Sequence, residues 1–596
     1  MAKRKKKTRK KKTKQKTAKP AARKSKPIAI ELAKKQREIS VAEFFEKNRH
    51  LLGFDNKKKA LLTTIKEAVD NALDACEDAG VLPEISVEII NMSPKPEIKK
   101  ETDNGQTTLT EEVKKPATQI SNGDRFRVIV EDNGPGIVKK QIPNIFAKLL
   151  YGSKFHTLKQ SRGQQGIGIS AAALYGQLTT GRPVRIVSRI SPKHPAHYYE
   201  LKINTKTNEP QIVKENEIKW DKEHGTKIEL DLEGTYQKAG QSVDNYLKQT
   251  AIVNPHVTLI YTNPIAEQSV FSRVTELLPK EPKAIKPHPY GVELGRLIKI
   301  LRDTRAHSLS GFLQTEFSRV GSGTAKQICE NAALLPTLKP KTLSREQAEK
   351  LYEGIQKTRL ISPPTDCISP IGAELLEKSL KKELKAEFYC AVSRPPAVYR
   401  GNPFQIEVAC AYGGEQPAEG TITLLRFANR VPLLYQQGAC AITKSVVGTK
   451  WSPYGLNQSK RSLPTGPCTM VVHIASVWVP FTSESKEAIA HYPEIIKEIK
   501  LALQECGRKL SSYIHKKKKI IAEGKKRDYI TTYIPYVSSA LRELLKLKAA
   551  DKEKIEKLLK KILEKKRGVL KDIKVDVSEF EEEFALEKEE DEEKED

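Results

Sequence analysis

The sequence predicts an α+β protein of several domains, and three observations lead to that fold class. Its 596 residues are enough for three or four separate hydrophobic cores. Helical periodicity and period-two alternation take turns over about residues 28–235, which indicates helices layered on a sheet. A purely helical block follows, and strands then return ahead of long lysine-rich helices.

These changes of pattern divide the chain into expected parts. They are a basic arm (1–27), an α/β domain (28–240) with an inserted polar loop (91–123), a junction (241–290), a helical domain (291–365), a second α/β domain with a long stalk helix (366–535), a helical segment (536–575) and an acidic tail (576–596).

Charge is distributed unevenly along the chain. The formal net charge is +30, and residues 1–27 hold 15 Lys and Arg without one acid, whereas residues 576–596 hold 13 acids and two lysines. Neither end has enough apolar residues to build a core, so we expect both to be disordered. Subtracting both ends (+30 − 15 + 11) leaves a body near +26. Such a body favours a polyanionic partner such as nucleic acid, the alternative being a merely soluble basic protein.

The eight cysteines and the hydropathy pattern predict an intracellular protein. No CxxC pair or His-rich spacing is present, so zinc and a disulfide framework are both unexpected. No apolar run reaches the roughly 18 residues of a membrane span, and the N-terminus lacks a secretory core.

The first motif is EAVDNALDACEDAG, residues 67–80, with the periodicity of a helix. Glu67, Asn71 and Asp74 fall at i, i+4 and i+7 and share one stripe, while Val69, Ala72, Leu73 and Cys76 form the apolar face. Gly80 is placed to end the helix. Taken alone, this stretch fits either an amphipathic surface helix or a nucleotide site.

Segments with period-two alternation predict the strands that accompany this helix. They are residues 84–90, 125–131, 185–190, 198–203 and 226–232. A helix, the strand VTLIYTN and a Pro-rich stretch fill the junction.

The second motif, EDNGPGI, follows the second of these strands directly. Asp132 ends the strand, and Gly134 and Gly136 permit a tight backbone that a ligand can approach closely. The Asp132 carboxylate is then placed to accept a hydrogen bond from an exocyclic amine such as that of adenine. The other interpretation is a simple hairpin turn.

The third motif is SRGQQGIGIS, a glycine-rich loop that opens into an Ala-rich helix expected from Ser170. Backbone N–H groups of such a loop, backed by a helix N-terminus, form an anion cradle. The spacing fits neither a P-loop nor a dinucleotide fingerprint. A fourth motif, HGTKIELDL, places Thr226 where it can touch a nucleotide or fix the loop.

Taken in this order, the four motifs resemble the Bergerat-type (GHKL) ATPase fold, a two-layer α/β sandwich shared by type II topoisomerases, MutL proteins, ninety-kilodalton heat-shock chaperones and sensor histidine kinases. The resemblance implies that Glu67 activates the attacking water and that Asn71 holds Mg²⁺ on the phosphates of ATP. Asp132 would read adenine. The remaining implied nucleotide-binding residues are Gly134, Gly136, Ser153, Lys154, Arg162, Gly163, Gln164, Gln165, Gly166, Ile167, Gly168, Ile169 and Thr226.

Two later stretches narrow the resemblance to the ATPase chains of type IIB topoisomerases. The helical block resembles a helix-two-turns-helix module, in which Lys326 would lie near DNA phosphates. The stretch 475–510 resembles the family's transducer domain, whose loop lysine reaches the γ-phosphate and senses hydrolysis; Lys486 is the matching position. KWSPYGL resembles a DNA-touching element through Trp451 and Tyr454, although Ser452 replaces its lysine.

The resemblance implies an ATP-driven enzyme that relaxes and decatenates DNA with a partner. ATP would dimerise two copies, with residues 30–50 exchanged between them, and cleavage would belong to a separate A subunit in a heterotetramer of two A and two B chains. Double-stranded DNA would be the substrate, in a prokaryotic, archaeal-like cytoplasm and nucleoid, with a nuclear setting not excluded. Two rivals stay open: an ATP-driven clamp or chaperone, and a DNA-binding scaffold with an inactive nucleotide site.

Overall fold

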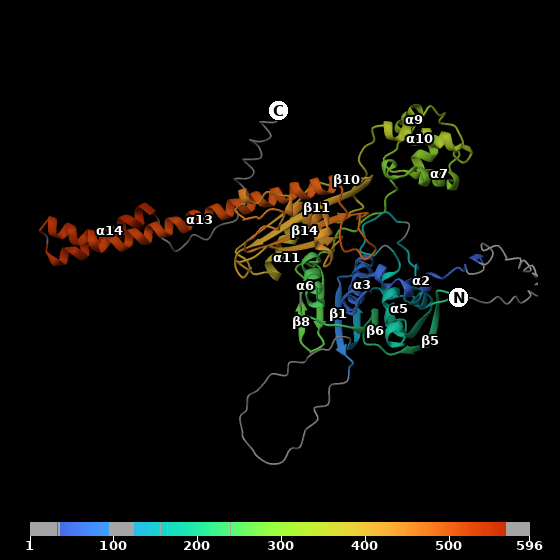
Figure 1. Ribbon diagram of the computed structural model, residues 1–596, viewed down its shortest axis with the longest axis horizontal. Coiled ribbons are helices and arrows are strands. Elements are labelled where there is room, and N and C mark those ends of the chain that lie inside the picture. The colour runs from blue at the N-terminus through green and yellow to red at the C-terminus, as the bar shows by residue number, and fades with distance from the viewer. Residues whose placement is uncertain are drawn as a thin grey trace, which may run out of the picture.

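A computed structural model describes residues 32–33, 36–93, 124–154, 157–163, 165–238, 240–546 and 548–567. The predicted basic arm, the acidic tail, nearly all of the loop 91–123 and Gln164 lie outside these residues. Figure 1 shows an N-terminal α/β layer in blue to green, a second sheet domain in orange above it, and a small helical module to one side. A pair of red helices projects away from this body.

The N-terminal domain is built on one eight-stranded sheet. Its strand order is β5-β4-β3-β6-β2-β1-β7-β8, antiparallel throughout except for the parallel pair β1 and β7. Strands β1 and β2 alternate between buried and partly exposed residues, as period-two segments with one covered face should. The strands are β1 Glu84–Asn91, β2 Asp124–Asp132, β3 Val184–Arg189, β4 Ala196–Asn204, β5 Glu209–Ile218, β6 Gly225–Gly234, β7 Thr258–Thr262 and β8 Gln268–Phe271.

Helices cover one face of this sheet and enclose the largest core. The helices of this region are α2 Val41–Lys47, α3 Lys57–Asp78, α4 Ile142–Ala147, α5 Gly168–Thr180 and α6 Val243–Val253. The Asn56 side chain caps α3 by accepting a hydrogen bond from Lys59 N at 2.8 Å. Gly80 follows the end of α3 with φ +69°, which confirms the predicted stop. The predicted apolar face of α3 is buried.

The sequence pattern missed one strand of this domain and misplaced the end of the domain. Strand β5 was not predicted, because its residues are mostly exposed and polar on both faces, so no alternation marks it. The domain also does not end at residue 240: α6 packs under the sheet, and β7 and β8 extend it to Phe271. Most of the expected junction 241–290 therefore belongs to the first domain.

The helical block has a core of its own, built from residues between Val292 and Ile355. Its helices are α7 Leu294–Asp303, α8 Leu309–Glu316, α9 Ser322–Asn331 and α10 Arg345–Lys357. Ser344 and Gln347 form a complete capping box at the start of α10.

The second α/β domain is a mixed sheet with a very long helix across it. Strand β14 is buried along its whole length and lies between β11 and β12. The elements of this domain are α11 Ala373–Glu383, β9 Phe388–Ser393, β10 Ala397–Tyr399, β11 Asn402–Tyr412, β12 Thr423–Ala428, β13 Val431–Pro432, α12 Ala441–Val447, β14 Cys468–Ser476 and α13 Pro493–Leu544.

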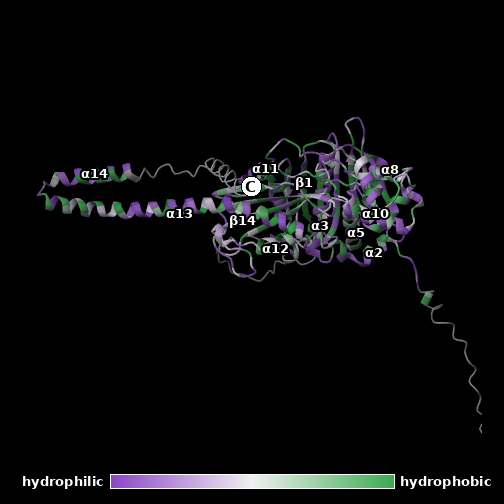
Figure 2. Cartoon of the chain, turned by 90° about the horizontal axis from the view of Figure 1, so that it is seen from above, coloured by the Kyte–Doolittle hydropathy of each residue, from purple (hydrophilic) through white to green (hydrophobic). Residues whose placement is uncertain are grey.

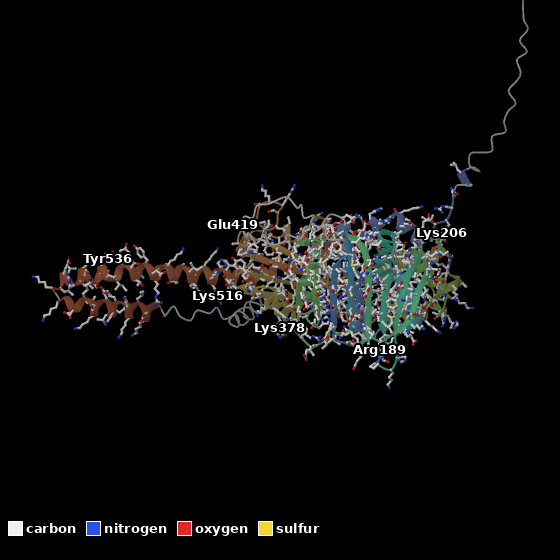
Figure 3. All side chains as sticks on the ribbon, turned by 90° about the horizontal axis from the view of Figure 1, so that it is seen from below. Arg189, Lys206, Lys378, Glu419, Lys516 and Tyr536 are labelled. Carbon is white, nitrogen blue, oxygen red and sulfur yellow. The ribbon has the colours of Figure 1, made fainter. Side chains whose placement is uncertain are left out.

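The stalk helix does not end at the expected domain boundary. The sequence places that boundary at residue 535, yet α13 begins at Pro493 and runs through Pro535 to Leu544. Helix α14 (Ala549–Arg567) then packs back along it. Hydrophilic and hydrophobic residues mix along this projection (Figure 2). Lys516 lies near its root and Tyr536, 71% exposed, far out along it (Figure 3).

Two composition-based expectations concern cysteines and membranes. All eight cysteines are buried and form no disulfide. Among the helices that the structure describes, none is both long and apolar enough to cross a membrane.

Candidate functional site

A cavity of about 650 Å³ lies between α3, the end of β2 and the start of α5. Helix α3 supplies one wall with Glu67 and Asn71, and β6 supplies Thr226. The other predicted residues that line the cavity are Asp132, Gly136, Ser153, Lys154, Gly163, Gln165, Gly166, Ile167, Gly168, Ile169 and Lys486. Segments separated by more than 400 residues in sequence thus meet at one site. Figure 1 shows the second sheet domain lying next to the N-terminal domain.

The Glu67 carboxylate packs directly against the first residue of α5. A Cβ atom at Gly168 would lie 1.8 Å from Glu67 Oε2, so only glycine leaves room for the carboxylate. One turn further along α3, Asn71 Oδ1 lies near Gly163, 3.5 Å from the position of a Cβ there. A carboxylate and an amide oxygen therefore face the same glycine-rich segment.

Asp132 is a buried carboxylate held by two backbone donors. Its Oδ1 accepts hydrogen bonds from Gly134 N at 2.8 Å and Thr226 N at 3.1 Å. Burial raises the pKa of Asp132 to about 6, although these two hydrogen bonds oppose the shift. The bonds orient the carboxylate so that Oδ2 remains available as an acceptor, and Gly134 acts behind it rather than lining the cavity.

The glycine-rich segment and α5 form an anion-binding geometry. Gly166 has φ +60°, and the N-cap of α5, Ile167, makes no side-chain capping bond. The first N–H groups of this 13-residue helix thus have no capping side chain and face the cavity, as phosphate sites at helix N-termini require. The helix starts at Gly168, two residues before the predicted Ser170.

The apolar wall of the cavity is the part that motif reasoning missed. Ile137, Ile145 and Phe146 line the side toward α4, and Phe54 closes the other. An adenine ring needs apolar faces, but single apolar residues carry no distinctive pattern in a sequence.

The prediction places Arg162 at the nucleotide, but its side chain does not line the cavity. Its side chain is 3% exposed and lies behind the cavity, where its two terminal nitrogens contact Asp74 Oδ1 at 2.9 Å and Glu77 at 2.7 and 2.8 Å. These partners hold the pKa of Arg162 above its usual range despite burial. Asp74 also pairs with Lys154 Nζ at 2.8 Å and so orders the pocket.

Lys486 enters the cavity from the second α/β domain. Its backbone lies in the left-handed region with φ +53°, and its Nζ donates to Arg162 O at 2.9 Å. Two residues earlier, Glu484 accepts a hydrogen bond from Gln165 Nε2. The loop from one domain thus rests on the glycine-rich segment of the other.

No cluster of three His, Cys, Asp or Glu side chains suited to a metal ion occurs among the described residues. The cavity nevertheless fits a magnesium–nucleotide complex, because Mg²⁺ at such sites takes few protein ligands and several phosphate oxygens. Asn71 supplies the amide oxygen beside the anion cradle.

The three residues predicted to contact DNA differ in their exposure to solvent. Lys326 lies on α9 with its side chain 73% exposed, so its contact stays a prediction. Trp451 is fully buried and donates from Nε1 to Val446 O at 2.7 Å, so the prediction that its indole touches DNA is wrong for this conformation. Tyr454 is half-buried against Gly507 of α13.

Comparison with known proteins agrees with this geometry. Residues 56–233 match the family described as histidine kinase-, DNA gyrase B- and HSP90-like ATPase, and residues 363–526 match that described as topoisomerase VI B subunit, transducer.

Two relatives match over most of the chain. The type 2 DNA topoisomerase 6 B subunit of Methanococcoides burtonii is 50% identical over 87% of this chain and 79% of that protein. Its counterpart in Archaeoglobus fulgidus is 45% identical over 92% of this chain and 86% of that protein. The gyrase B protein of Myxococcus xanthus, a solved structure, shows 9% identity and a TM-score of 0.38 over 78% of this chain and 94% of that one.

Proposed function

The chain belongs to the family of type 2 DNA topoisomerase VI B subunits, and we propose that the cavity bounded by Glu67, Asp132 and the glycine-rich segment is its ATP site. The chain is the ATP-hydrolysing component of a type IIB DNA topoisomerase, and the clamp or chaperone alternative is not favoured. The observation that carries the site proposal is the meeting of Glu67, Asp132, the α5 N-terminus and Lys486 in one cavity.

Glu67 is proposed as the general base. Its carboxylate takes a proton from a water molecule, the water oxygen attacks the γ-phosphorus, and the bond to the β,γ-bridging oxygen breaks to give ADP and phosphate. The contact with Gly168 holds the carboxylate at the N-terminus of α5, beside the N–H groups that would bind the γ-phosphate. Asp132 Oδ2 accepts a hydrogen bond from the adenine amino group.

Asn71 is proposed to hold Mg²⁺ together with phosphate oxygens of ATP. When bound, the ion neutralises phosphate charge during transfer. Asn71 lies one helical turn from Glu67, which places the amide and the base on the same side of the nucleotide.

Lys486 is proposed to exchange its bond to Arg162 O for one to the γ-phosphate when ATP binds. The Lys486 loop and α13 belong to the same domain, so a shift at the phosphate moves the stalk. We further propose that ATP binding dimerises two copies and that a partner protein, the A chain, cleaves DNA in a heterotetramer of two A and two B chains. Hydrolysis would gate passage of one duplex through the cut in another, in the cytoplasm at the nucleoid.

Replacing the base tests the proposed site. Glu67→Ala should leave binding of an ATP analogue within about threefold while lowering kcat for ATP hydrolysis by about 100- to 10,000-fold. Combined with its cleavage partner, the wild-type protein should relax supercoiled DNA only with ATP and Mg²⁺, and the variant should not. Glu88→Ala, on β1 outside the cavity, is the matched control. An ATPase rate in Glu67→Ala equal to that of the control would refute Glu67 as the base.

A further inference from the structure

The two-residue turn between β12 and β13 lies at the contact between the two α/β domains. Its residues, Asn429 and Arg430, both lie in the left-handed region with φ +48° and +65°. Asparagine adopts this region readily, whereas an arginine persists there where its surroundings fix it. Both residues are buried where the second α/β domain meets the root of the glycine-rich segment, residues 160–163.

Asn429 joins this root to the sheet of its own domain. Its Nδ2 donates to Ser161 O at 3.2 Å and to Ser476 O at 2.9 Å, and its Oδ1 accepts from Ser476 N at 2.8 Å. The same amide therefore contacts the end of β14 and the start of the glycine-rich segment.

Arg430 interacts electrostatically with the same root, through the carboxylate of Glu77. Its Nη1 lies 4.0 Å from Glu77 Oε1, and Glu77 in turn holds Arg162. Its Nη2 donates to Pro370 O at 3.1 Å and Ser369 O at 3.3 Å. Because Arg430 and Arg162 share one carboxylate in a buried setting, a displacement of either guanidinium changes the balance of charge at the other.

Gln160 completes the connection from the side of the root. Its backbone N donates to Cys367 O at 2.9 Å, and its side chain exchanges two hydrogen bonds with the backbone of Ser369 at 2.7 and 3.2 Å. The root is thus bonded to the second α/β domain at Gln160, Ser161 and Arg162, the last through Lys486.

The turn is fixed rigidly to the core of its own domain. Arg430 N donates to His473 Nε2 at 3.0 Å, and His473 Nδ1 lies 2.8 Å from Glu407 Oε2. The Glu407 carboxylate accepts from Ile371 N and Gly372 N at 2.9 and 2.7 Å, at the start of α11. A movement of this sheet therefore carries the turn with it.

We propose that the Asn429–Arg430 turn is a positioning element of the ATPase, which sets the root of the glycine-rich segment and couples it to the second α/β domain independently of Lys486. This inference rests on the proposed ATP site, because it names what holds the phosphate-binding segment in place. Within the described residues, Arg162 and Arg430 meet at the shared Glu77 carboxylate, which joins the turn to the root through charge as well as through the Asn429 amide.

The test uses the full chain with Arg430→Gly. Glycine adopts φ +65° without strain, so the turn and its backbone bonds persist while the guanidinium is lost. Arg400→Gly is the matched control, because Arg400 is an exposed arginine with φ +46° in the turn between β10 and β11. Arg430→Lys, which keeps the charge, tests rescue.

Hydrogen exchange with a non-hydrolysable ATP analogue gives a readout that general destabilisation would not produce. In wild-type protein and Arg400→Gly, nucleotide should slow exchange about tenfold or more in peptides from residues 165–175 and from 128–137. In Arg430→Gly the slowing at 165–175 should fall below about twofold while that at 128–137 persists, and Arg430→Lys should restore part of it.

The outcomes separate this inference from the site on which it rests. Equal slowing of 165–175 in Arg430→Gly and wild-type protein overturns the role of the turn and leaves the ATP site intact. Loss of slowing in both peptides of Arg430→Gly means a general defect and also overturns it. Absence of slowing at 165–175 in wild-type protein overturns the proposed site and the inference together.

Discussion

The proposed role of Asp132 depends on how its carboxylate is held. Its Oδ1 already accepts hydrogen bonds from Gly134 N and Thr226 N, so the proposed recognition of adenine depends on Oδ2. An amide at this position has only one acceptor oxygen, and the two backbone donors would take it. The NH₂ group would then face the amino group of adenine, donor against donor.

The first prediction is that Asp132→Asn weakens nucleotide binding although the side chain keeps its shape. The new NH₂ group and the adenine amino group would face each other without an acceptor between them, which costs about 1–3 kcal/mol of binding free energy. The Kd for an ATP analogue should therefore rise roughly 10- to 100-fold in calorimetry. Glu88→Gln, the same change of an acid to an amide on β1 outside the cavity, is a suitable control. Binding within twofold of wild type by Asp132→Asn would rule out Oδ2 as the adenine acceptor.

The raised pKa of Asp132 has a consequence for stability. The folded protein holds this proton more tightly than the unfolded chain, since the pKa moves from 3.8 to about 6. The stabilisation by this group is therefore complete below about pH 4 and is lost as the pH rises through about 6. Nucleotide affinity changes in the opposite sense, because the ionised carboxylate is the better acceptor.

Short motifs predicted which residues gather at the site better than where individual side chains point. Glu67, Asn71, Asp132 and four of the predicted glycines line one cavity, because short motifs fix local backbone and side-chain chemistry. The side chains of Arg162 and Trp451 are buried away from it, since an arginine or a tryptophan looks the same in sequence whether it faces a ligand or a core. Only the tertiary partners of these two residues distinguish the cases.

At the scale of elements, the position of α5 against α3 depends on Gly168, which has no side chain. A methyl group at Gly168 would meet the Glu67 carboxylate, and helix and carboxylate would have to separate. The relative placement of α3 and α5 therefore sets the distance between the base and the phosphate-binding N–H groups.

We predict that Gly168→Ala lowers turnover far more than stability. A displacement of about 1 Å at the base costs roughly 100-fold in rate, and kcat for ATP hydrolysis should fall by that order. Gly295→Ala, in α7 with open space around its Cβ position, is the control and should stabilise its helix by up to about 1 kcal/mol. Steady-state ATPase and thermal unfolding check both variants; an unchanged kcat for Gly168→Ala would contradict the placement of Glu67.

Elements were predictable where one face is buried and hard to predict elsewhere. The strands β1, β2 and β6 followed from alternation, and α3 from its apolar face and its Gly80 stop. Strand β5 was not predicted, because both of its faces are polar at the sheet edge and no alternation marks it. The membership of β7 in the first sheet depends on its parallel pairing with β1, a contact over about 170 residues that local patterns do not encode.

At the scale of the whole molecule, we propose the N-terminal segment as the contact between two copies. In α2, Phe45 packs against the core of the first domain, whereas Phe44 is 40% exposed beside it. Ile39 on the same segment and Leu51 directly after it are 37% and 38% exposed. Exposed apolar side chains grouped at the predicted exchange segment fit an interface that forms when ATP binds.

We predict that Phe44→Glu prevents ATP-dependent dimerisation and leaves the monomer folded. A two-fold interface uses the same residue twice, so removing two phenylalanine contacts costs about 3 kcal/mol or more, a rise in the dimer Kd of roughly 100-fold. Sedimentation velocity with a non-hydrolysable ATP analogue measures this. Leu277→Glu, at a residue 75% exposed after β8, is the control and should dimerise normally. If Phe44→Glu also dimerises normally, residues 36–50 are not the contact, and the coupling from Lys486 to the stalk must operate without exchange of this segment.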